Sequence, residues 1–325
     1  MNRVLILVAG AVAWCAAPAQ AQSWPTHPIT MVVPFAAGGP TDAVARIVAE
    51  QMSKALGQAI LVENELGAGG TTGTTRVAQS KPDGYTIMMG QMGTHGTAPA
   101  VYPKLRYNPV TDFAPIGMAA LAPVLIVGRK DLPPKDLREL VAYAKANAAK
   151  LNEAHAGVGS ISYTSCTLFN AAMGVKITQV AYRGTGPALN DMLAGQIDIM
   201  CDQVVTYVEQ VKGGTIKAYA IAADERSPAL PNVPTTKEAG LPAFKLIAWN
   251  ALFAPKGTPP DIIAKLNGAL DKALDDENVR KRLADQGGIV PKKAERSAAW
   301  LQAFVKSEVE RLTPLLKAAL AEQNK

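Results

Sequence analysis

The sequence has few of the side chains on which metal and nucleophile chemistry depends. Its three histidines, His27, His95 and His155, are scattered without the spacing of metal ligands, which argues against a zinc site and a catalytic triad. It has no G-x-S-x-G string, and no P-loop lysine follows its GAGGTTG turn. The common signatures of hydrolases and nucleotide-binding enzymes are therefore missing, and we expect neither a cofactor nor a bound metal.

Charge of one sign is not concentrated anywhere in the chain. The 33 lysines and arginines exceed the 27 acidic residues by six, but they are spread along the expected helices. Nucleic-acid binding usually needs a basic patch or stripe, so it is not expected here. A mild positive field would attract anions, although salt screens it within about 8 Å.

A long apolar run occurs only at the start of the chain. Arg3 is followed by the apolar stretch Val4 to Ala17 and by the small-x-small site Ala19-Gln20-Ala21. This stretch is shorter than the roughly 20 residues that a membrane-spanning helix needs, and the pattern is that of a secretory signal peptide. We therefore expect residues 1–21 to be removed near Ala21, leaving a periplasmic chain that does not insert into the membrane.

Two cysteines, Cys166 and Cys201, remain after that cleavage. Disulfides can form in the periplasm, so both a bridge and two free thiols are open. The expected positions, a helix for Cys166 and a strand end for Cys201, favour two buried free thiols.

Short apolar runs alternate with glycine turns and helical periodicity. Ile29 to Val33 is followed by the turn PFAAGGPTD and by apolar residues at helical spacing, and the pattern repeats from Ala59 to Ala78. This order of strand, turn and helix predicts an α/β fold with a mostly parallel sheet. About 300 mature residues are too many for one compact core and favour two lobes.

The rest of the chain continues this alternation. We expect a linker at Pro109 to Gly117, a proline-rich crossing segment around 225–242, and a long C-terminal helix that Pro314 kinks or splits. Residues 22–122 and 224–325 are assigned to a discontinuous first lobe and residues 123–223 to an inserted second lobe, with two crossings as the hinge. The remaining expected strands are Tyr85 to Met89, Val124 to Gly128, Ala154 to Val158, Ile177 to Tyr182, Ile197 to Met200, Ile216 to Ala222 and Phe244 to Phe253.

The glycine turns are the candidate binding elements. A helix N-terminus presents unpaired N–H groups and about half a positive charge, so a glycine turn that leads into a helix can hold an anion. Taken singly, such a turn is better explained as a tight connection between elements, and only the convergence of several turns favours binding. The first-lobe candidates are Phe35, Ala36, Gly38, Gly39, Thr41, Gly69, Gly70, Thr71, Gly73, Gln91 and, beside the cleft, His95.

The second lobe offers two polar turns at the expected carboxyl ends of strands. Ligands of open α/β sheets bind beyond those ends, so four turns from two lobes are expected to meet at one cleft. Arg183 is expected to pair with a second carboxylate of the ligand, or else is a solvated surface arginine. Asp202, expected just after a strand, would orient a ligand hydroxyl or hold cleft water. The second-lobe candidates are Ser160, Ser162, Tyr163, Arg183, Gly184, Thr185 and Asp202.

Four segments together resemble one protein family. They are WPTHPITMVVPFAAGGPTD, NELGAGGTTGTTRVAQSKPDGYTIMMG, VAYRGTGPALNDMLAGQIDIMCDQ and RSPALPNVPTTKEAGLP with the following APKGTPP. From about Trp24 to the end, the chain resembles the TctC or Bug receptors of tripartite tricarboxylate transporters. The resemblance implies a type II periplasmic binding protein, a monomer with two Rossmann-like lobes, that delivers carboxylates to one large and one small membrane subunit.

The resemblance also implies where a carboxylate binds. In such receptors the first-lobe turns grip it through backbone amides and bridging waters, which here fall at 35–41 and 69–73. This chain has YRGTGP where a lysine often precedes the glycine, and the planar Arg183 favours a dicarboxylate, aliphatic or aromatic. Two alternatives stay open: an exported hydrolase or transferase using Ser160 or Ser162 with His95 or His155, and a ligand-sensing partner of a sensor kinase.

Overall fold

The structure is a computed structural model that describes residues 24–323, so the expected signal peptide lies outside the described residues. Among residues 24–323, no helix combines the length and apolar composition that a membrane span requires. The strands are β1 (Ile29–Val33), β2 (Ile60–Asn64), β3 (Thr86–Gln91), β4 (Phe113–Arg129), β5 (Asn152–His155), β6 (Thr178–Ala181), β7 (Ile199–Gln203), β8 (Ile216–Ile221) and β9 (Ile247–Pro255).

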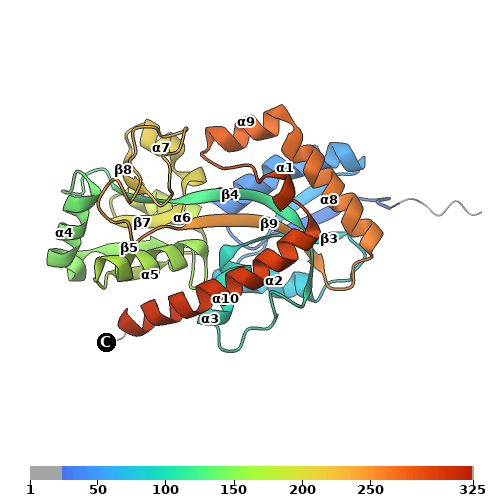
Figure 1. The fold of residues 1–325 in the computed structure, drawn as a ribbon, viewed down its shortest axis with the longest axis horizontal. Coiled ribbons are helices and arrows are strands. Elements are labelled where there is room, and N and C mark those ends of the chain that lie inside the picture. The colour runs from blue at the N-terminus through green and yellow to red at the C-terminus, as the bar shows by residue number, and fades with distance from the viewer. Residues whose placement is uncertain (1–23, 324–325) are drawn as a thin grey trace, which may run out of the picture.

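Helices follow most of these strands, as the alternation predicts (Figure 1). The α-helices are α1 (Pro40–Leu56), α2 (Thr71–Ala78), α3 (Ala98–Val101), α4 (Leu137–Asn147), α5 (Ile161–Met173), α6 (Thr185–Leu193), α7 (Val208–Lys212), α8 (Pro260–Asp275), α9 (Glu277–Asp285) and α10 (Ala298–Gln323). A π-helix, η2 (Met92–Thr97), and the short 3-10 helices η1 (Ala68–Gly70), η3 (Ala148–Lys150), η4 (Val204–Thr206) and η5 (Lys293–Glu295) complete the described elements.

The strands form one curled, mixed sheet with the order β2-β1-β3-β9-β4-β7-β5-β6, and β8 pairs with β4 off this path. Strands β1, β2 and β3 are parallel at one end, and β5, β6 and β7 are parallel at the other. The antiparallel strands β4 and β9 run lengthwise between the two ends (Figure 1). The expected α/β periplasmic binding protein fold is confirmed.

Strand β4 belongs to both halves of the molecule. Its residues up to Pro123 pair with β9, whereas Val124–Arg129 pair with β7 on one side and β8 on the other. At a rise of about 3.3 Å per residue, its 17 residues span roughly 55 Å. The expected division after residue 122 stays a prediction, which this exchange of strand partners supports.

The proline-rich segment after β8 packs on the second half. Thr235 bridges to Ile221, and Leu230 and Val233 join the core beneath β7 and β8. The chain returns to the first half where Leu246 meets the start of β9. These contacts favour a return crossing there rather than after residue 223, so we propose residues 124–246 as the second lobe.

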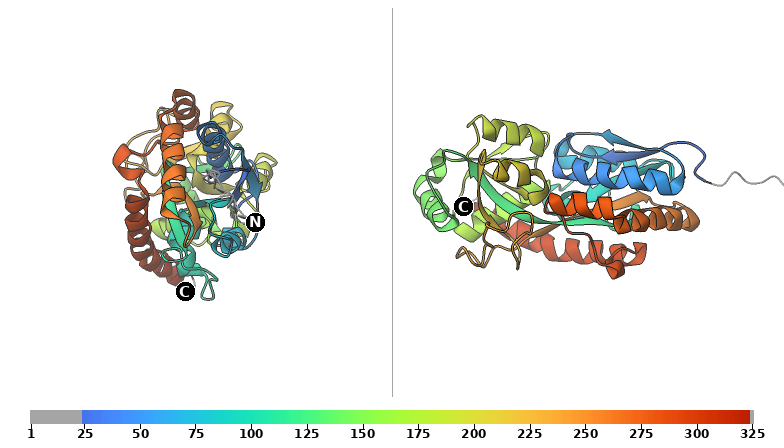
Figure 2. Two further views of the ribbon diagram at one scale, coloured as in Figure 1. Left: turned by 90° about the vertical axis from the view of Figure 1, so that its right-hand side faces the viewer. Right: turned by 90° about the horizontal axis from the view of Figure 1, so that it is seen from above.

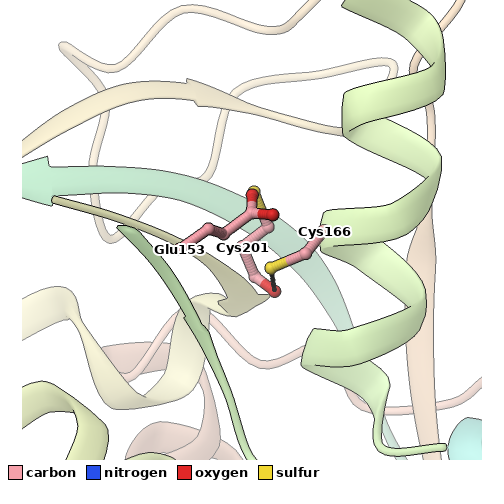
Figure 3. Close-up of side chains that lie close together, drawn as sticks. All are labelled: Glu153, Cys166 and Cys201. Carbon is pink, nitrogen blue, oxygen red and sulfur yellow. Dashed lines mark hydrogen bonds between the residues drawn. The ribbon is translucent and has the colours of Figure 1, made fainter. Parts of the chain in front are cut away.

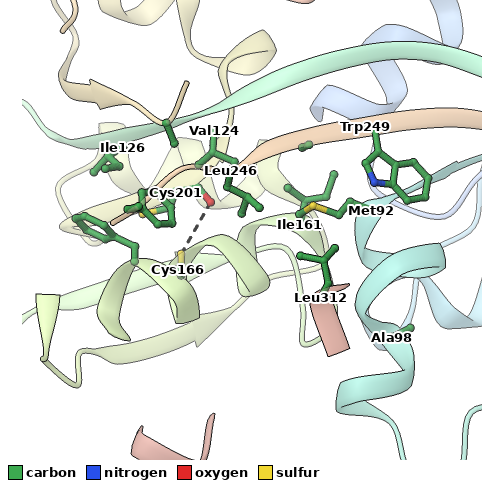
Figure 4. Packing of buried hydrophobic residues seen from close by; sticks show 14 of the residues in the cluster. Met92, Ala98, Val124, Ile126, Ile161, Cys166, Cys201, Leu246, Trp249 and Leu312 are labelled. Atoms are coloured by element: carbon green, nitrogen blue, oxygen red, sulfur yellow. Dashed lines mark hydrogen bonds between the residues drawn. The ribbon is translucent and has the colours of Figure 1, made fainter. Parts of the chain in front are cut away.

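The two halves share part of their core. One apolar cluster runs continuously from Cys166 and Cys201 in the second half to Met92 and Trp249 in the first (Figure 4). Helix α10 packs on α3 and η2 in the first half and on α5 in the second, while α1 packs beside α8 in the first half (Figure 2). The halves are therefore joined by helix packing as well as by the strand crossings.

Two local expectations were wrong, and one helix was not expected. Residues from Phe113 onward in the expected linker belong to β4, where register shifts at Pro115 to Gly117 accommodate the proline and glycine. Pro314 does not split α10, because buried Leu312 and Leu316 hold both sides against the core, and the kink there stays a prediction. Helix α9 was missed, although Asp276 caps it by accepting a hydrogen bond from the Val279 N–H group at 3.1 Å.

Candidate ligand-binding site

Two helices begin opposite each other where the halves meet. Helix α1 starts after Gly39 and α6 starts after Gly184, and neither glycine supplies a side-chain cap. A Cβ atom on Gly184 would lie 2.6 Å from the Ala36 Cβ, and one on Gly39 would lie 3.8 Å from the Thr185 Cβ. The two helix starts are therefore in contact, with the unpaired N–H groups of both first turns at one place.

The other two predicted turns also meet. A Cβ atom on Gly69 would lie 1.7 Å from the Val158 carbonyl oxygen, which only glycine permits. The Tyr102 hydroxyl donates to that same carbonyl at 2.6 Å, a contact between the halves that the sequence did not indicate. All four turns follow the carboxyl ends of β1, β2, β5 and β6, as the strand-turn-helix pattern predicts.

A small cavity of about 10 Å³, room for about one water, lies between the helix starts. Eight predicted site residues line it: Phe35, Gly39, Thr41, Gln91, Ser160, Ser162, Thr185 and Asp202. Its other lining residues are Pro40, Ala156, Ile161 and Gln203. Halves that meet this closely must separate to admit a ligand larger than water.

A second hollow of about 420 Å³ adjoins the first. Gly69, Gly70 and Arg183 line it together with Phe35 and Ala156, which belong to both spaces. The Arg183 side chain is exposed. Arg183, the predicted partner of a second ligand carboxylate, therefore lies beside the small cavity.

Asp202 is the acidic group of the small cavity. It lies inside β7, where the sequence analysis expected it just after the strand. Its Oδ2 accepts from the Thr185 hydroxyl at 2.5 Å and its Oδ1 from the Gln203 N–H at 2.8 Å. Burial raises the pKa of Asp202 to about 6 despite these hydrogen bonds.

Asp42 fixes the shape of the first turn. Its carboxylate accepts hydrogen bonds from Gly38 N–H at 3.0 Å, Arg46 Nε at 2.9 Å and Asn64 Nδ2 at 2.9 Å. Burial works to raise the pKa of Asp42, but these hydrogen bonds outweigh it and the pKa is lowered. The Gly38 N–H is therefore committed to Asp42, which leaves the first turn of α1 as the donor to a ligand.

The serines at the start of α5 are held by neutral partners. Ser160 caps the helix by accepting from the Tyr163 N–H at 3.1 Å, and Ser162 accepts from the Ala156 N–H at 2.9 Å. Their hydroxyls lie 3.1 Å apart. In residues 24–323 neither hydroxyl is hydrogen bonded to a histidine ring, which does not favour the hydrolase alternative.

Some predicted residues lie elsewhere. His95 is fully buried and stacks on Phe253 with ring centroids 4.0 Å apart, and burial lowers its pKa to about 3, so it is a neutral core residue rather than a cleft residue. Ala36, Gly38 and Gly184 shape the two turns that touch, and Tyr163 packs edge-to-face against the His155 ring. None of these four predicted residues lines either hollow. Thr71 and Gly73 pack within the second turn and α2.

A buried cluster that no sequence motif indicated joins β5, α5 and β7 (Figure 3). The ligand-type atoms of Glu153, Cys166 and Cys201 all lie within 4.8 Å of one another. Burial raises the pKa of both thiols, which keeps them protonated at neutral pH. The Cys201 thiol donates to Glu153 Oε1 at 3.7 Å, and the Cys166 thiol donates to the Ala154 carbonyl oxygen at 3.7 Å. Both cysteines are free and buried, and we interpret the cluster as hydrogen-bonded core packing.

Comparison with known proteins agrees with the geometry. Residues 44–320 match the model of the tripartite tricarboxylate transporter family receptor, TctC. The chain is 45% identical over 316 residues, 97% of this chain and 90% of the other, to the UPF0065 protein in the TAR-I ttuE-ttuC' intergenic region of Agrobacterium vitis.

Solved structures give the same assignment. MatC from Rhodopseudomonas palustris, with bound malate, is 50% identical with a TM-score of 0.88, covering 90% of this chain and all of MatC. R. palustris Rpa4515, with adipate, is 33% identical with a TM-score of 0.87, covering 91% of this chain and 98% of its own. The chain therefore belongs to the TctC or Bug family of periplasmic solute-binding receptors.

Proposed function

We propose that the chain binds a dicarboxylate between its halves in the periplasm and delivers it to a tripartite transporter, without catalysing a reaction. The observation that carries the proposal is the contact between the starts of α1 and α6, both without a side-chain cap, at one cavity. An acid placed there would satisfy N–H groups of both first turns, and its negative charge would meet the positive ends of two helices.

The second carboxylate would lie toward Arg183 in the adjoining hollow. An arginine fork can hold a carboxylate through two hydrogen bonds, which suits a ligand long enough to reach from the small cavity to the hollow. The relatives solved with malate and adipate support this choice of ligand class. Binding between the halves would hold them closed, which is the state that a membrane subunit would distinguish from the open one.

A thermal-shift panel tests the proposal. Mono-, di- and tricarboxylates, including malate and adipate, are added to the purified chain lacking residues 1–21. A dicarboxylate at about 100 times its dissociation constant should raise the free energy of unfolding by about 2.7 kcal/mol. No stabilisation by any acid of the panel would contradict carboxylate binding, and stabilisation by tricarboxylates alone would contradict the dicarboxylate assignment.

A further inference from the structure

Asp202 is an acidic side chain in the wall of a cavity that is proposed to bind an acid. It is 1% exposed, and the groups that donate to it, the Thr185 hydroxyl and the Gln203 N–H, are neutral. In the part of the chain that the structure describes, no lysine, arginine or histidine lines this cavity. The negative charge of an ionised Asp202 is thus balanced only by dipoles.

The elements around Asp202 supply no compensating cation. Helix α6 and strand β4 contribute no ionisable side chain to the described cavity wall. Burial lowers the pKa of His155 to about 4 and raises the pKa of the Cys201 thiol to about 11, so both are neutral at pH 7. Arg46 on α1 pairs with Asp42 at 2.9 Å. Arg129 at the far end of β4 pairs with Asp198, and Lys54 on α1 pairs with Glu50. The other ionisable groups on the neighbouring elements are Glu153 on β5, Tyr163 and Cys166 on α5, Asp191 on α6, and Tyr207 after η4.

The cavity has room for about one water, so a ligand carboxylate that entered it as the halves separate would lie directly against the Asp202 carboxylate. Two carboxylates that share a buried site do not both stay ionised, because the repulsion between them raises the pKa of one. Protonation of one partner replaces that repulsion with an O–H···O⁻ hydrogen bond, which is shorter and stronger than a neutral one.

We propose that Asp202 takes one proton from solvent when an organic acid binds and donates it in a hydrogen bond to the ligand carboxylate. The ligand enters ionised, the Asp202 carboxylate becomes a carboxylic acid, and release of the ligand returns the proton to solvent. This inference rests on the proposed function. Burial brings the pKa of the ligand-free Asp202 to about 6 despite its hydrogen bonds. The repulsion of a ligand carboxylate in the same buried site should raise this pKa by roughly two to three units more, which protonates Asp202 at pH 7.5.

Isothermal titration calorimetry in two buffers measures the number of protons taken up when the ligand binds. Malate and adipate are titrated into the protein at pH 7.5 in phosphate and in Tris, whose ionisation enthalpies differ. We expect uptake of about one proton per ligand, and affinity that rises up to about tenfold per pH unit as the pH falls from 8.5 to 6.5. Carboxylic acids ionise near pH 4, so the ligand itself stays charged throughout this range.

Two variants identify the residue that takes up the proton. Asp202→Asn keeps an N–H donor for the ligand and an oxygen for Thr185 but cannot titrate, so its binding heat should be independent of buffer and its affinity independent of pH. Glu153→Gln is the matched control, because Glu153 is another buried carboxyl, with its pKa raised to about 7, and it does not line the cavity. This variant should keep the uptake of one proton.

Each other outcome overturns the inference. Saturable binding by the wild-type protein with equal heats in both buffers would show that the ligand binds without proton uptake. This result would overturn the inference but not the binding function, and it needs no variant. If Glu153→Gln lost the proton uptake and Asp202→Asn kept it, Glu153 rather than Asp202 would be the group that is protonated. Loss of affinity in Asp202→Asn at every pH would mean that Asp202 acts as an anion. Absence of binding by either acid and by the whole panel would overturn the proposed function and this inference together.

Discussion

The starts of helices α1 and α6 are alike in backbone and different in charge. Each follows a glycine without a side-chain cap, and each has one buried aspartate beside it. Asp42, in the first turn of α1, is paired with Arg46 and its pKa is lowered. Asp202, on β7 beside the start of α6, has only neutral donors and its pKa is raised to about 6.

The difference separates a structural acid from one that can respond to a ligand. Asp42 already receives three hydrogen bonds and a cation, so it fixes the loop whether or not a ligand is present. Protonation of Asp202 would remove the cost of burying its negative charge, and its side chain lines the cavity. Substitutions at these two positions should therefore have opposite effects on stability.

The largest effect is expected from Asp42→Ala. It removes the acceptor of the Gly38 N–H and of Arg46 Nε, and one of the two acceptors of the Asn64 amide, which should lower the free energy of unfolding by about 3 kcal/mol at pH 7. Because the folded-state pKa of Asp42 is lowered, its contribution is present above pH 3.8 and is lost as the pH falls through the folded value. Urea unfolding measures this, with the exposed Asp131→Ala as control. A variant as stable as the control would contradict the structural role.

Gly184→Val should separate the two helix starts. Its Cβ would lie 2.6 Å from the Ala36 Cβ, so the closed arrangement would need backbone movement. Such overpacking costs roughly 1–3 kcal/mol, and every 1.4 kcal/mol is tenfold, so affinity for a dicarboxylate should fall about 30-fold. Gly268→Ala, in open space on α8, should bind like the wild type. Equal affinities for Gly184→Val and the control would show that this contact is not needed for binding.

Asp202→Asn should stabilise the ligand-free protein. The folded pKa of about 6 exceeds the unfolded value of 3.8, so the ionised form is destabilised by folding, and this penalty grows between those values and is constant above pH 6. Removing the charge should raise the free energy of unfolding by about 2–3 kcal/mol at pH 8 and by only about 0.5 kcal/mol at pH 4. A loss of stability at pH 8 would show that the Asp202 charge is well solvated.

Arg183→Ala should have the smallest effect. The side chain is exposed, so its attraction to a ligand carboxylate is partly screened, and dicarboxylate affinity should fall about fivefold. Monocarboxylates, which lack the second group, should bind as before. Calorimetry with both ligand classes, and with the exposed Arg280→Ala as control, makes the comparison. Equal losses for the two classes would remove Arg183 from the second-carboxylate role.

The sequence predicts the elements well because their signals are local. Apolar periodicity located α1 and β1, and glycine turns located the starts of α1 and α6 to within a few residues. The convergence of the four turns followed from one rule of sheet topology. Eight of the predicted residues line the small cavity for that reason.

What the sequence missed depends on contacts between distant residues. Tyr102 reaches Val158 across 56 positions, and the Glu153 cluster joins two strands and a helix. The environment of His95 is set by Phe253, which lies far away in sequence. The proline-rich segment 225–242 was expected to be a crossing because proline marks irregular backbone, but the bridge between Thr235 and Ile221 of β8 decides where it packs.

The account depends most on an acid bound between the starts of α1 and α6. A crystal structure with the dicarboxylate that gives the largest thermal shift tests this directly. We expect one carboxylate within hydrogen-bonding distance of N–H groups in the first turns of both helices and beside the Asp202 carboxyl. A ligand held by Arg183 alone, or bound away from these two helix starts, would contradict the account.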